Sequence, residues 1–279
     1  MVRRAAELPE AVSFAANRAV GVIALEVVSE AGRSRRARVR EEGSLRVRFP
    51  GHPARQLEAV VINTAGGVAG GDSYALDVAV GDNAALVLTT AAAEKVYRAI
   101  DDDATMSLNL RAEAGAELSW LPRETILFDR SRLSRRIEVD LAADAKFLAA
   151  EAVLFGRTGM GEEVASGRFL DRWRVRRGGE LIYAETVKLD GAVSRQLSKA
   201  AVAAGGLAYA TILMSPADER FAATLRAAEP RMRGEAGVSS WNGLTLARFL
   251  ARDGESLRHD MMMALHIALA GPLPRLWLN

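Results

Sequence analysis

Side chains that commonly bind metals or act as nucleophiles are scarce in this sequence. Cysteine is absent, and the histidines are His52, His259 and His266. His259 and His266 would lie on one face of a helix but roughly 10 Å apart along its axis, too far to chelate one ion. There is no Gly-x-Ser-x-Gly motif of a serine hydrolase. We therefore expect no thiolate or iron–sulfur site, and no high-affinity transition-metal site built by this chain alone.

Carboxylates remain as candidate oxygen ligands. Without imidazole or thiolate partners they hold transition-metal ions weakly, and most acidic side chains are simply surface charge. The candidate acids are Asp72, Glu94, Asp101 to Asp103, Glu124, Glu151, Glu162 and Glu163.

The most unusual stretch is the glycine-rich segment from Asn63 to Asp72, which contains the pairs Gly66-Gly67 and Gly70-Gly71. It lacks the spacing of a phosphate-binding loop, and a predicted strand follows it where such a loop would open a helix. Glycine permits positive φ and contact without a Cβ. The segment therefore predicts close backbone packing or approach by another chain.

Reactive side chains also gather between Thr89 and Arg98. Here Glu94, Lys95, Tyr97 and Arg98 place an acid, two bases and a phenol within five residues. The segment is a candidate for an active site or for an interface. A single Glu–Lys pair is more often a solvated edge of a protein.

Strands must position most of these side chains, because apolar and polar residues alternate with period two through much of the chain up to about residue 190. Similar turn sequences recur at 83–86, 115–118, 144–147 and 178–181, with last residues 32, 29 and 34 apart. Such spacing is typical of one supersecondary unit stacked repeatedly. We predict a mainly β fold, a solenoid-like helical stack of β-strands and hairpins, with a meandering sandwich as the alternative. Glu41 to Ser44 is predicted to be a hairpin turn.

The C-terminal third changes to helical periodicity. Ser215 and Pro216 provide an N-cap and a first-turn proline for a helix over about 216–228. An apolar stripe that includes Met261 predicts a second helix over about 255–270, closed by Gly271 and Pro272. The residues between the helices, 229–240, are predicted to be a loop. No linker divides the chain, so we predict a single domain over 1–279, with its β-stack over about 20–210.

The composition is that of an ordinary globular protein. The 279 residues include 37 Lys+Arg and 35 Asp+Glu, a net charge of +2. The arginine run from Arg33 to Arg48 lacks interleaved aromatic residues and is diluted by glutamates, which favours a solvated or protein-binding face over nucleic acid. No signal-peptide pattern and no bilayer-length apolar run is present, so we expect a cytoplasmic protein without a membrane partner.

Five motifs, in order along the chain, resemble those of the UreD family (UreH in some organisms), the urease accessory proteins. They cover the chain from about residue 20 to its end. One departure is that the family's glycine loop often begins with His-Pro-Pro, whereas Asn63-Thr64-Ala65 stands here, without an imidazole. The matching stretches are Ile62–Asp72, Thr89–Arg98, Trp120–Phe128, Gly156–Glu162 and Pro272–Trp277.

The resemblance implies a fold and a role. Family members look like stacks of β-strands in a helical superstructure with two α-helices, and they are not enzymes. They bind nickel-free urease and a helical accessory partner, UreF, which recruits the GTPase UreG. The assembly delivers Ni²⁺ while the active-site lysine of urease is carbamylated, and a water-filled passage through the UreD-like protein is the suggested route. No tightly bound cofactor is implied, only transient nickel.

The resemblance also selects residues. A conduit must release its metal, which suits hard oxygen ligands. The candidate transit carboxylates, in or near the family motifs, are Asp72, Glu94, Glu124, Glu151 and Glu162. The alternative for each is a structural carboxylate paired with an arginine such as Arg98, Arg123 or Arg157. The interface or motif residues are Gly66, Gly67, Gly70, Gly71, Thr89, Thr90, Lys95, Tyr97, Arg98, Arg157, Arg275 and Trp277.

Two other functions stay open. A purely structural scaffold would hold the urease complex without carrying metal and would need the same interfaces. An uncharacterised hydrolase would act at the Gly66–Asp72 loop, with Glu94 and Lys95 as acid and base. A protein that works between two partners is expected to expose apolar patches and to be poorly soluble alone. Trp277 is either one anchor for a partner or a latch onto its own core.

Overall fold

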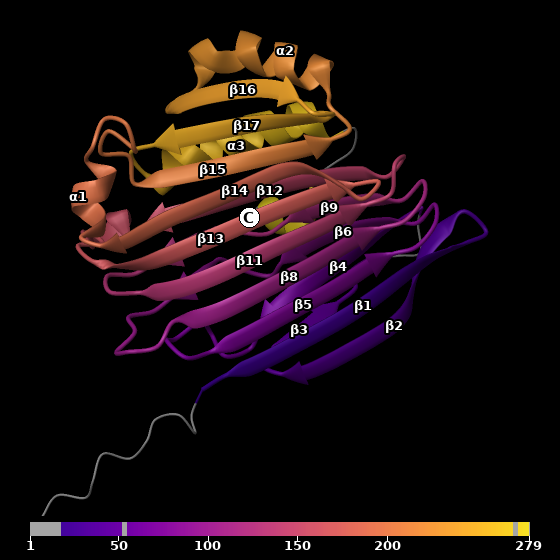
Figure 1. Ribbon diagram of the computed structural model, residues 1–279, viewed down its shortest axis with the longest axis horizontal. Helices are drawn as coiled ribbons and strands as arrows, with labels where there is room; N and C mark the ends of the chain where they lie inside the picture. Colours follow the sequence, from indigo (N-terminus) through magenta and orange to yellow (C-terminus); the bar gives the residue numbers. More distant parts are fainter. Residues whose placement is uncertain (1–17, 52–54, 270–272, 279) are drawn as a thin grey trace, which may run out of the picture.

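The computed structural model describes residues 18–51, 55–269 and 273–278. Strands dominate this part of the chain and form two large sheets. In each sheet the strands are stacked one after another along the same axis (Figure 1). The predicted mainly β, solenoid-like stack is confirmed. His52, Gly271 and Pro272 lie outside the described residues.

The first sheet, sheet A, has seven strands. In spatial order they are β14 (Glu180–Gly191), β13 (Gly167–Arg177), β11 (Arg132–Leu141), β8 (Ala104–Ala112), β5 (Ser73–Val80), β1 (Val20–Glu30) and β2 (Arg33–Gly43).

The second sheet, sheet B, has ten strands. Two short ones, β7 (Glu94–Val96) and β10 (Thr125–Leu127), pair with each other, and β10 also pairs with β12. The others, in spatial order, are β16 (Glu235–Trp241), β17 (Leu244–Ala251), β15 (Ala208–Ser215), β12 (Lys146–Phe155), β9 (Glu117–Leu121), β6 (Ala85–Thr90), β4 (Gln56–Asn63) and β3 (Leu45–Arg48).

The chain builds the stack by alternating between the sheets. Strands β5, β8, β11 and β13 are successive neighbours in sheet A, while β6, β9 and β12 come between them in sequence and belong to sheet B. Neighbours within each series are parallel. The colours in Figure 1 therefore follow the sequence from one end of the stack to the other.

The recurrent turns have two roles. Those at 83–86, 115–118 and 144–147 lead from sheet A to sheet B, whereas 178–181 closes the antiparallel hairpin of β13 and β14. The hairpin expected at Glu41 to Ser44 is wrong, because β2 ends there in sheet A and β3 begins in sheet B. Period-two alternation is the same in parallel and antiparallel strands, so it does not reveal which strands pair.

The main hydrophobic core lies between the sheets. On β11, Leu133, Ile137 and Val139 are fully buried and alternate with more exposed residues. Sheet B also buries its other face, under α2 (Glu219–Ala228) and α3 (Gly254–Ala268), which form a second core together with Trp277. Because β12 is covered on both faces, its sequence is a nearly continuous apolar run.

The two long helices lie close to their predicted limits. α2 begins at Glu219 rather than at Pro216. Ser215, the predicted cap, still belongs to β15, and the side chain of Asp218 caps the helix. α3 corresponds to the second predicted helix.

The periodicity does not predict several smaller elements. α1 (Val193–Leu197) lies within the range expected for the β-stack, and the strands continue beyond that range to Ala251. Strand β16 (Glu235–Trp241) covers the second half of 229–240, where a loop was expected, because its backbone pairs with β17. The 3-10 turns are η2 (Thr158–Met160), η3 (Glu229–Arg231) and η4 (Arg275–Trp277).

Candidate functional site

A small, partly open cavity lies between the two sheets. Its volume is about 60 Å³, and roughly 10–15 Å³ is enough for one water molecule. Apolar side chains line part of it. Its ionisable lining residues are Tyr74, Glu94, Arg123, Arg135 and Glu151. The cavity thus brings together Glu94 and Glu151, two of the predicted transit carboxylates.

Glu151 belongs to a buried ion-pair cluster, formed with Arg135 and Asp171, that bridges the sheets. Arg135 and Asp171 are paired neighbours on β11 and β13, and Glu151 comes from β12 of sheet B. The Arg135 guanidinium donates from Nη1 to Glu151 Oε2 at 2.7 Å and from Nη2 to Asp171 Oδ2 at 2.7 Å. Trp120 Nε1 donates to Glu151 Oε1 at 2.6 Å. The three charged side chains are at most 6% exposed, so the core holds two carboxylates for one guanidinium.

Burial sets the protonation of Glu151. Removal from water raises the pKa of its carboxyl group, the positive charge of Arg135 opposes that rise, and the negative charge of Asp171 adds to it. The net direction is upward. A proton on this carboxylate is therefore more favourable than it would be in water.

Glu94, on β7, is the second carboxylate of the cavity. Burial raises the pKa of its carboxyl group to about 7, opposed by a hydrogen bond from Asn63 and assisted by the negative charge of Asp72. Asn63 Nδ2 donates to Glu94 Oε1 at 3.2 Å. A carboxyl group with a pKa near 7 readily exchanges its proton at neutral pH.

Asp72 anchors the glycine-rich segment and is not among the residues that line the cavity. Its Oδ1 accepts from Ala19 N at 2.8 Å, and its Oδ2 accepts from Ala69 N at 2.8 Å. The Tyr74 hydroxyl donates to the same Oδ2 at 3.2 Å. These donors fit a structural carboxylate, although its partners are backbone groups and a phenol rather than an arginine.

The glycine-rich segment packs closely against the chain's own 95–102 region. A Cβ on Gly67 would lie 2.3 Å from the Tyr97 ring. One on Gly70 would lie 2.6 Å from both Ala99 Cβ and the carbonyl oxygen of Asp102. The close approach that glycine permits is therefore made within this chain. The other two glycines supply left-handed φ angles: Gly66 (79°) and Gly71 (85°).

Glu124 and Glu162 lie outside the cavity, each beside an arginine. Glu124 Oε2 is 3.4 Å from Arg123 Nε, and Glu162 Oε2 is 2.5 Å from Arg157 Nε. The Arg157 guanidinium also lies over the Phe128 ring, 4.3 Å from its centroid. These contacts fit the alternative in which the acid pairs with a neighbouring arginine.

Thr89 and Thr90 connect neighbouring backbone segments. Thr89 is buried and its hydroxyl donates to the Leu121 carbonyl oxygen at 2.6 Å. The Thr90 hydroxyl accepts from Arg123 N at 2.8 Å and donates to the Ala92 carbonyl oxygen at 3.1 Å. Both hydroxyls hold the inner edge of the Thr89–Arg98 segment in place.

Lys95, Tyr97 and Arg98 are exposed beside the glycine-rich segment. Tyr97 donates from its hydroxyl to the Gly66 carbonyl oxygen at 3.0 Å. Lys95 directly follows Glu94 on β7, so the two side chains point to opposite faces of the strand. Glu94 lines the cavity while Lys95 faces outward. This arrangement does not provide the acid–base pair of the hydrolase alternative.

Trp277 packs onto the second core of its own chain. It is 4% exposed, and its Nε1 donates to the Leu121 carbonyl oxygen at 2.9 Å. Arg123 lies over the indole ring and donates to the Leu276 carbonyl oxygen at 2.5 Å. The structure therefore favours the latch over the anchor. Arg275, on the same turn, is exposed.

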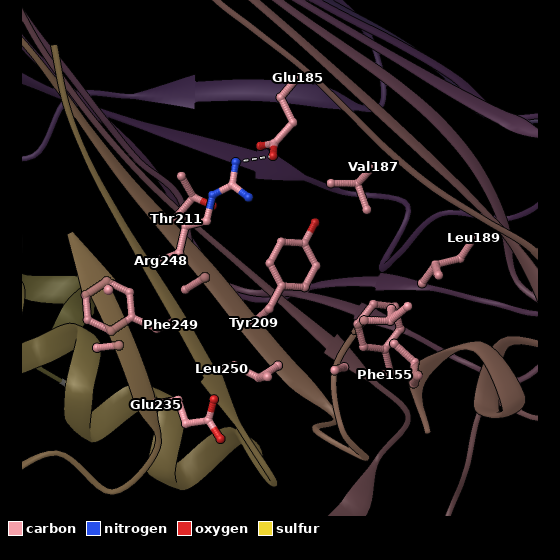
Figure 2. Close-up of a pocket in the computed structure, with 16 residues that line it drawn as sticks. Phe155, Glu185, Val187, Leu189, Tyr209, Thr211, Glu235, Arg248, Phe249 and Leu250 are labelled. Atoms are coloured by element: carbon pink, nitrogen blue, oxygen red, sulfur yellow. Dashed lines mark hydrogen bonds and ion pairs between the residues drawn. The ribbon is translucent and has the colours of Figure 1, made fainter. Parts of the chain in front are cut away.

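A larger cleft of about 440 Å³ lies at the C-terminal end of the stack, between β14 and the strands β15 to β17 (Figure 2). Figure 2 shows Tyr209 between apolar side chains and an ion pair. Phe155 and Leu189 lie on one side, and the ion pair of Glu185 with Arg248 lies on the other.

Tyr209 lines this cleft and lies within electrostatic reach of the buried ion-pair cluster. Burial raises the pKa of its phenol well above the ordinary value, Asp171 raises it further and Arg135 opposes the rise. Arg135 lines the cavity and Tyr209 lines the cleft. The ion-pair cluster therefore borders the cavity through Arg135 and Glu151 and lies within electrostatic reach of the Tyr209 phenol.

None of the five family motifs contains Arg135, Asp171 or Tyr209. Arg135 occupies an inward position of β11, two residues from the buried Leu133 and Ile137. A charged residue at an inward period-two position is the signal that identifies such groups, because charges are rarely buried without a partner. No comparable signal marks Tyr209.

The described residues offer single carboxylates rather than a cluster of metal ligands. Among the residues that the structure describes, no group of three or more His, Asp or Glu side chains is arranged to hold a metal ion. Glu94 stands apart from the ion-pair cluster, and both oxygens of Glu151 already accept hydrogen bonds. Isolated carboxylates bind transition metals weakly and reversibly.

Most of the arginine run forms β2, an exposed edge strand of sheet A, while Arg46 and Arg48 lie on β3 of sheet B. Nearby glutamates offset its charge, in agreement with a solvated face. The ion pairs are Arg35–Glu30 at 3.3 Å, Arg38–Glu26 at 3.7 Å and Arg40–Glu42 at 2.6 Å.

Comparison with known proteins gives the family. A family model described as "UreD urease accessory protein" matches residues 19–278. "Urease accessory protein UreD" of Rhodopseudomonas palustris (strain BisA53) is 52% identical over 272 residues, which are 98% of this chain and 95% of that protein. "Urease accessory protein UreD 3" of Bradyrhizobium sp. (strain BTAi1 / ATCC BAA-1182) is 52% identical over 266 residues, 95% of this chain and 96% of the relative. "Urease accessory protein UreD" of R. palustris (strain HaA2) is 49% identical over 279 residues, 100% of both chains.

The fold and its cavity define a two-sheet β-stack with a carboxylate-lined interior. The family match over nearly the whole chain then identifies the family: the chain belongs to the UreD family of urease accessory proteins. It is an accessory protein and not an enzyme. Within the described ranges, no helix combines the length and apolar character that crossing a bilayer requires.

Proposed function

We propose that this chain is the scaffold and nickel-delivery component of a urease activation complex. It binds nickel-free urease and a UreF-like helical protein, through which a UreG-like GTPase joins, and Ni²⁺ passes through its interior as cargo. One observation carries the proposal: Glu94, in a family motif, and Glu151, near another, come from different strands and line the same cavity.

The charge balance of the interior supports passage of a cation. The buried charged groups between the sheets are Asp72, Arg135, Glu151 and Asp171, and the partly buried Glu94 and Arg123 lie beside them. Acids therefore exceed bases, and the resulting negative potential attracts cations. Passage also requires release, and oxygen ligands without imidazole or thiolate hold nickel weakly enough to let it leave.

We limit the proposed transit residues to Glu94 and Glu151, which line the cavity. Asp72 anchors the glycine-rich segment, and Glu124 and Glu162 pair with arginines outside the cavity. The route runs from the cavity, past the ion-pair cluster, to the cleft beside Tyr209.

The first experiment compares cells that carry the urease genes with and without this gene. We expect inactive, nickel-free urease in its absence and recovery of both activity and nickel when the gene is restored. Fully active, nickel-loaded urease in its absence would refute the accessory role here.

The second experiment separates a conduit from a purely structural scaffold. Glu94→Gln and Glu151→Gln remove charge but keep an oxygen acceptor, so complex assembly should persist while urease activation at limiting nickel falls. Glu113→Gln, at an exposed position away from the cavity, is the matched control. Normal activation by the double variant Glu94→Gln/Glu151→Gln at limiting nickel would leave the scaffold as the function.

A further inference from the structure

We propose that Arg135 determines nickel release: its guanidinium occupies the position between Glu151 and Asp171 where a divalent cation would otherwise be chelated, so that passing nickel is not trapped. This inference rests on the proposed passage of nickel through the interior.

The contacts of Arg135 place its charge between the two acids. Nη1 reaches Glu151 at 2.7 Å, while Nη2 and Nε reach the two oxygens of Asp171 at 2.7 and 3.0 Å. Glu151 comes from sheet B and Asp171 from sheet A, so the guanidinium fills the gap between the sheets. The Arg135 guanidinium thus lies between the two carboxylates and neutralises part of their charge.

Without Arg135, two buried carboxylates would face each other beside a water-sized cavity. Their indole partners would remain, since Trp120 donates to Glu151 at 2.6 Å and Trp173 donates to Asp171 at 3.3 Å. Two uncompensated negative charges away from water strongly favour a divalent cation. Two acids from opposite sheets can then supply several oxygen ligands to one ion.

Arginine suits this task better than lysine. Burial alone would lower the pKa of the Arg135 guanidinium, but Asp171 and Glu151 raise it above the ordinary value overall. It therefore remains charged at every physiological pH and forks to both acids. The cluster keeps one excess negative charge, which attracts a cation without offering it a vacant chelate.

The test measures nickel binding to full-length chains by titration calorimetry with nickel chloride, together with their melting temperatures. Arg135→Gln should bind nickel at least about tenfold more tightly than wild type, and nickel should raise its melting temperature. Arg135→Gln/Asp171→Asn, which removes one of the two acids, should lose the gain. Arg135→Lys, which keeps a positive charge but cannot fork to both acids, should fall between wild type and Arg135→Gln.

Arg132→Gln is the matched control, because Arg132 pairs with Asp103 in a partly exposed site on the same strand. Its nickel affinity should equal that of wild type. If Arg135→Gln folds only with nickel present, the metal replaces the guanidinium as proposed. If it stays unfolded at saturating nickel, or binds nickel no more tightly than wild type, the inference is overturned, while the conduit still depends on Glu94 and Glu151.

Urease activation at limiting nickel distinguishes the two proposals. Trapping predicts that Arg135→Gln, once folded, delivers less nickel and retains more of it than wild type. If Arg135→Gln binds nickel more tightly than wild type yet delivers as much nickel to urease, the position between Glu151 and Asp171 does not lie on the nickel route. That result would overturn the release role together with the conduit.

Discussion

Glu94 changes its charge close to neutral pH, since burial raises the pKa of its carboxyl group from 4.5 to about 7. The folded chain therefore holds this proton more tightly than the unfolded chain does. The resulting stability is fully present below about pH 4.5 and is lost as the pH rises to about 7. Above that range the folded state carries the cost of a buried charge.

We predict that Glu94→Gln removes this pH dependence. At pH 8 the variant should have a higher free energy of unfolding than wild type, by on the order of 1–3 kcal/mol, because no charge is buried. The difference in free energy of unfolding between Glu94→Gln and wild type should decrease as the pH is lowered toward 5. Urea unfolding from pH 5 to pH 8 measures it, with the exposed Glu113→Gln as the control. A difference that stays constant with pH would contradict the assignment.

The candidate carboxylates show what residue type and motif can and cannot predict. Glu94 is a candidate transit carboxylate because it lies in a family motif, and Glu151 because it lies near one. Both line the cavity. Glu124 and Glu162 were selected in the same way, yet both pair with arginines elsewhere. Strand register and turn geometry decide which acids face the interior, and these depend on tertiary pairing. Arg135 stands in an ordinary alternating strand, so only its inward position distinguishes it.

At the scale of elements, the glycine-rich segment depends on a close approach. A methyl group at Gly70 would meet backbone and Ala99 at 2.6 Å, whereas one at Gly237 on β16 would meet no heavy atom within 4 Å. We predict that Gly70→Ala lowers the free energy of unfolding by about 1–3 kcal/mol. Gly237→Ala should be neutral or stabilise by about 0.4–1 kcal/mol. Urea unfolding of both variants tests this, and equal effects would contradict the packing argument.

Helix α3 begins at a side-chain cap. The Asp253 carboxylate accepts from Ser256 N at 2.8 Å, and this hydrogen bond lowers the pKa of Asp253. The stability it supplies is therefore present at neutral pH and lost as the solution becomes strongly acidic. Asp253→Ala should cost about 1 kcal/mol at pH 7, and Asp253→Asn, which keeps an acceptor, should cost less. Equal losses in chemical unfolding would show that the cap contributes little.

Sequence periodicity predicts the strands and the long helices better than their connections. Alternation in β11 identifies its buried face, but parallel pairing across the crossovers leaves no local mark. Strand β16 was missed because Gly237 and its serines weaken the strand pattern, while pairing with β17 still holds it extended. The start of α2 moved from Pro216 to Glu219 because the β15 ladder continues through Ser215.

At the scale of the molecule, sheet B is shared by two hydrophobic cores. Leu86 belongs to the core between the sheets and Leu265 to the core under the helices, and both are fully buried. We predict that Leu86→Ala and Leu265→Ala each cost about 2–5 kcal/mol and still leave one unfolding transition, because neither core persists without sheet B. Leu181→Ala, at a half-exposed position, is the control.

Circular dichroism and tryptophan fluorescence measure this prediction together. Trp120 and Trp173 report on the core between the sheets, and Trp277 reports on the other. The two signals should change at the same denaturant concentration in each protein. Separate transitions would mean that the cores fold independently.

The order of strands in the stack also bears on how the chain is made. Ser73 pairs with Thr105, and Thr105 pairs in turn with Ser134, so each strand of this series joins a neighbour that left the ribosome before it. The stack can therefore grow during translation, from its indigo end upward in Figure 1. The contact of Trp277 with Leu121 joins residues 156 positions apart and forms only after Trp277 has been synthesised. Until then one apolar face of sheet B lacks its full cover, which gives quality-control proteases a means to recognise an unfinished chain.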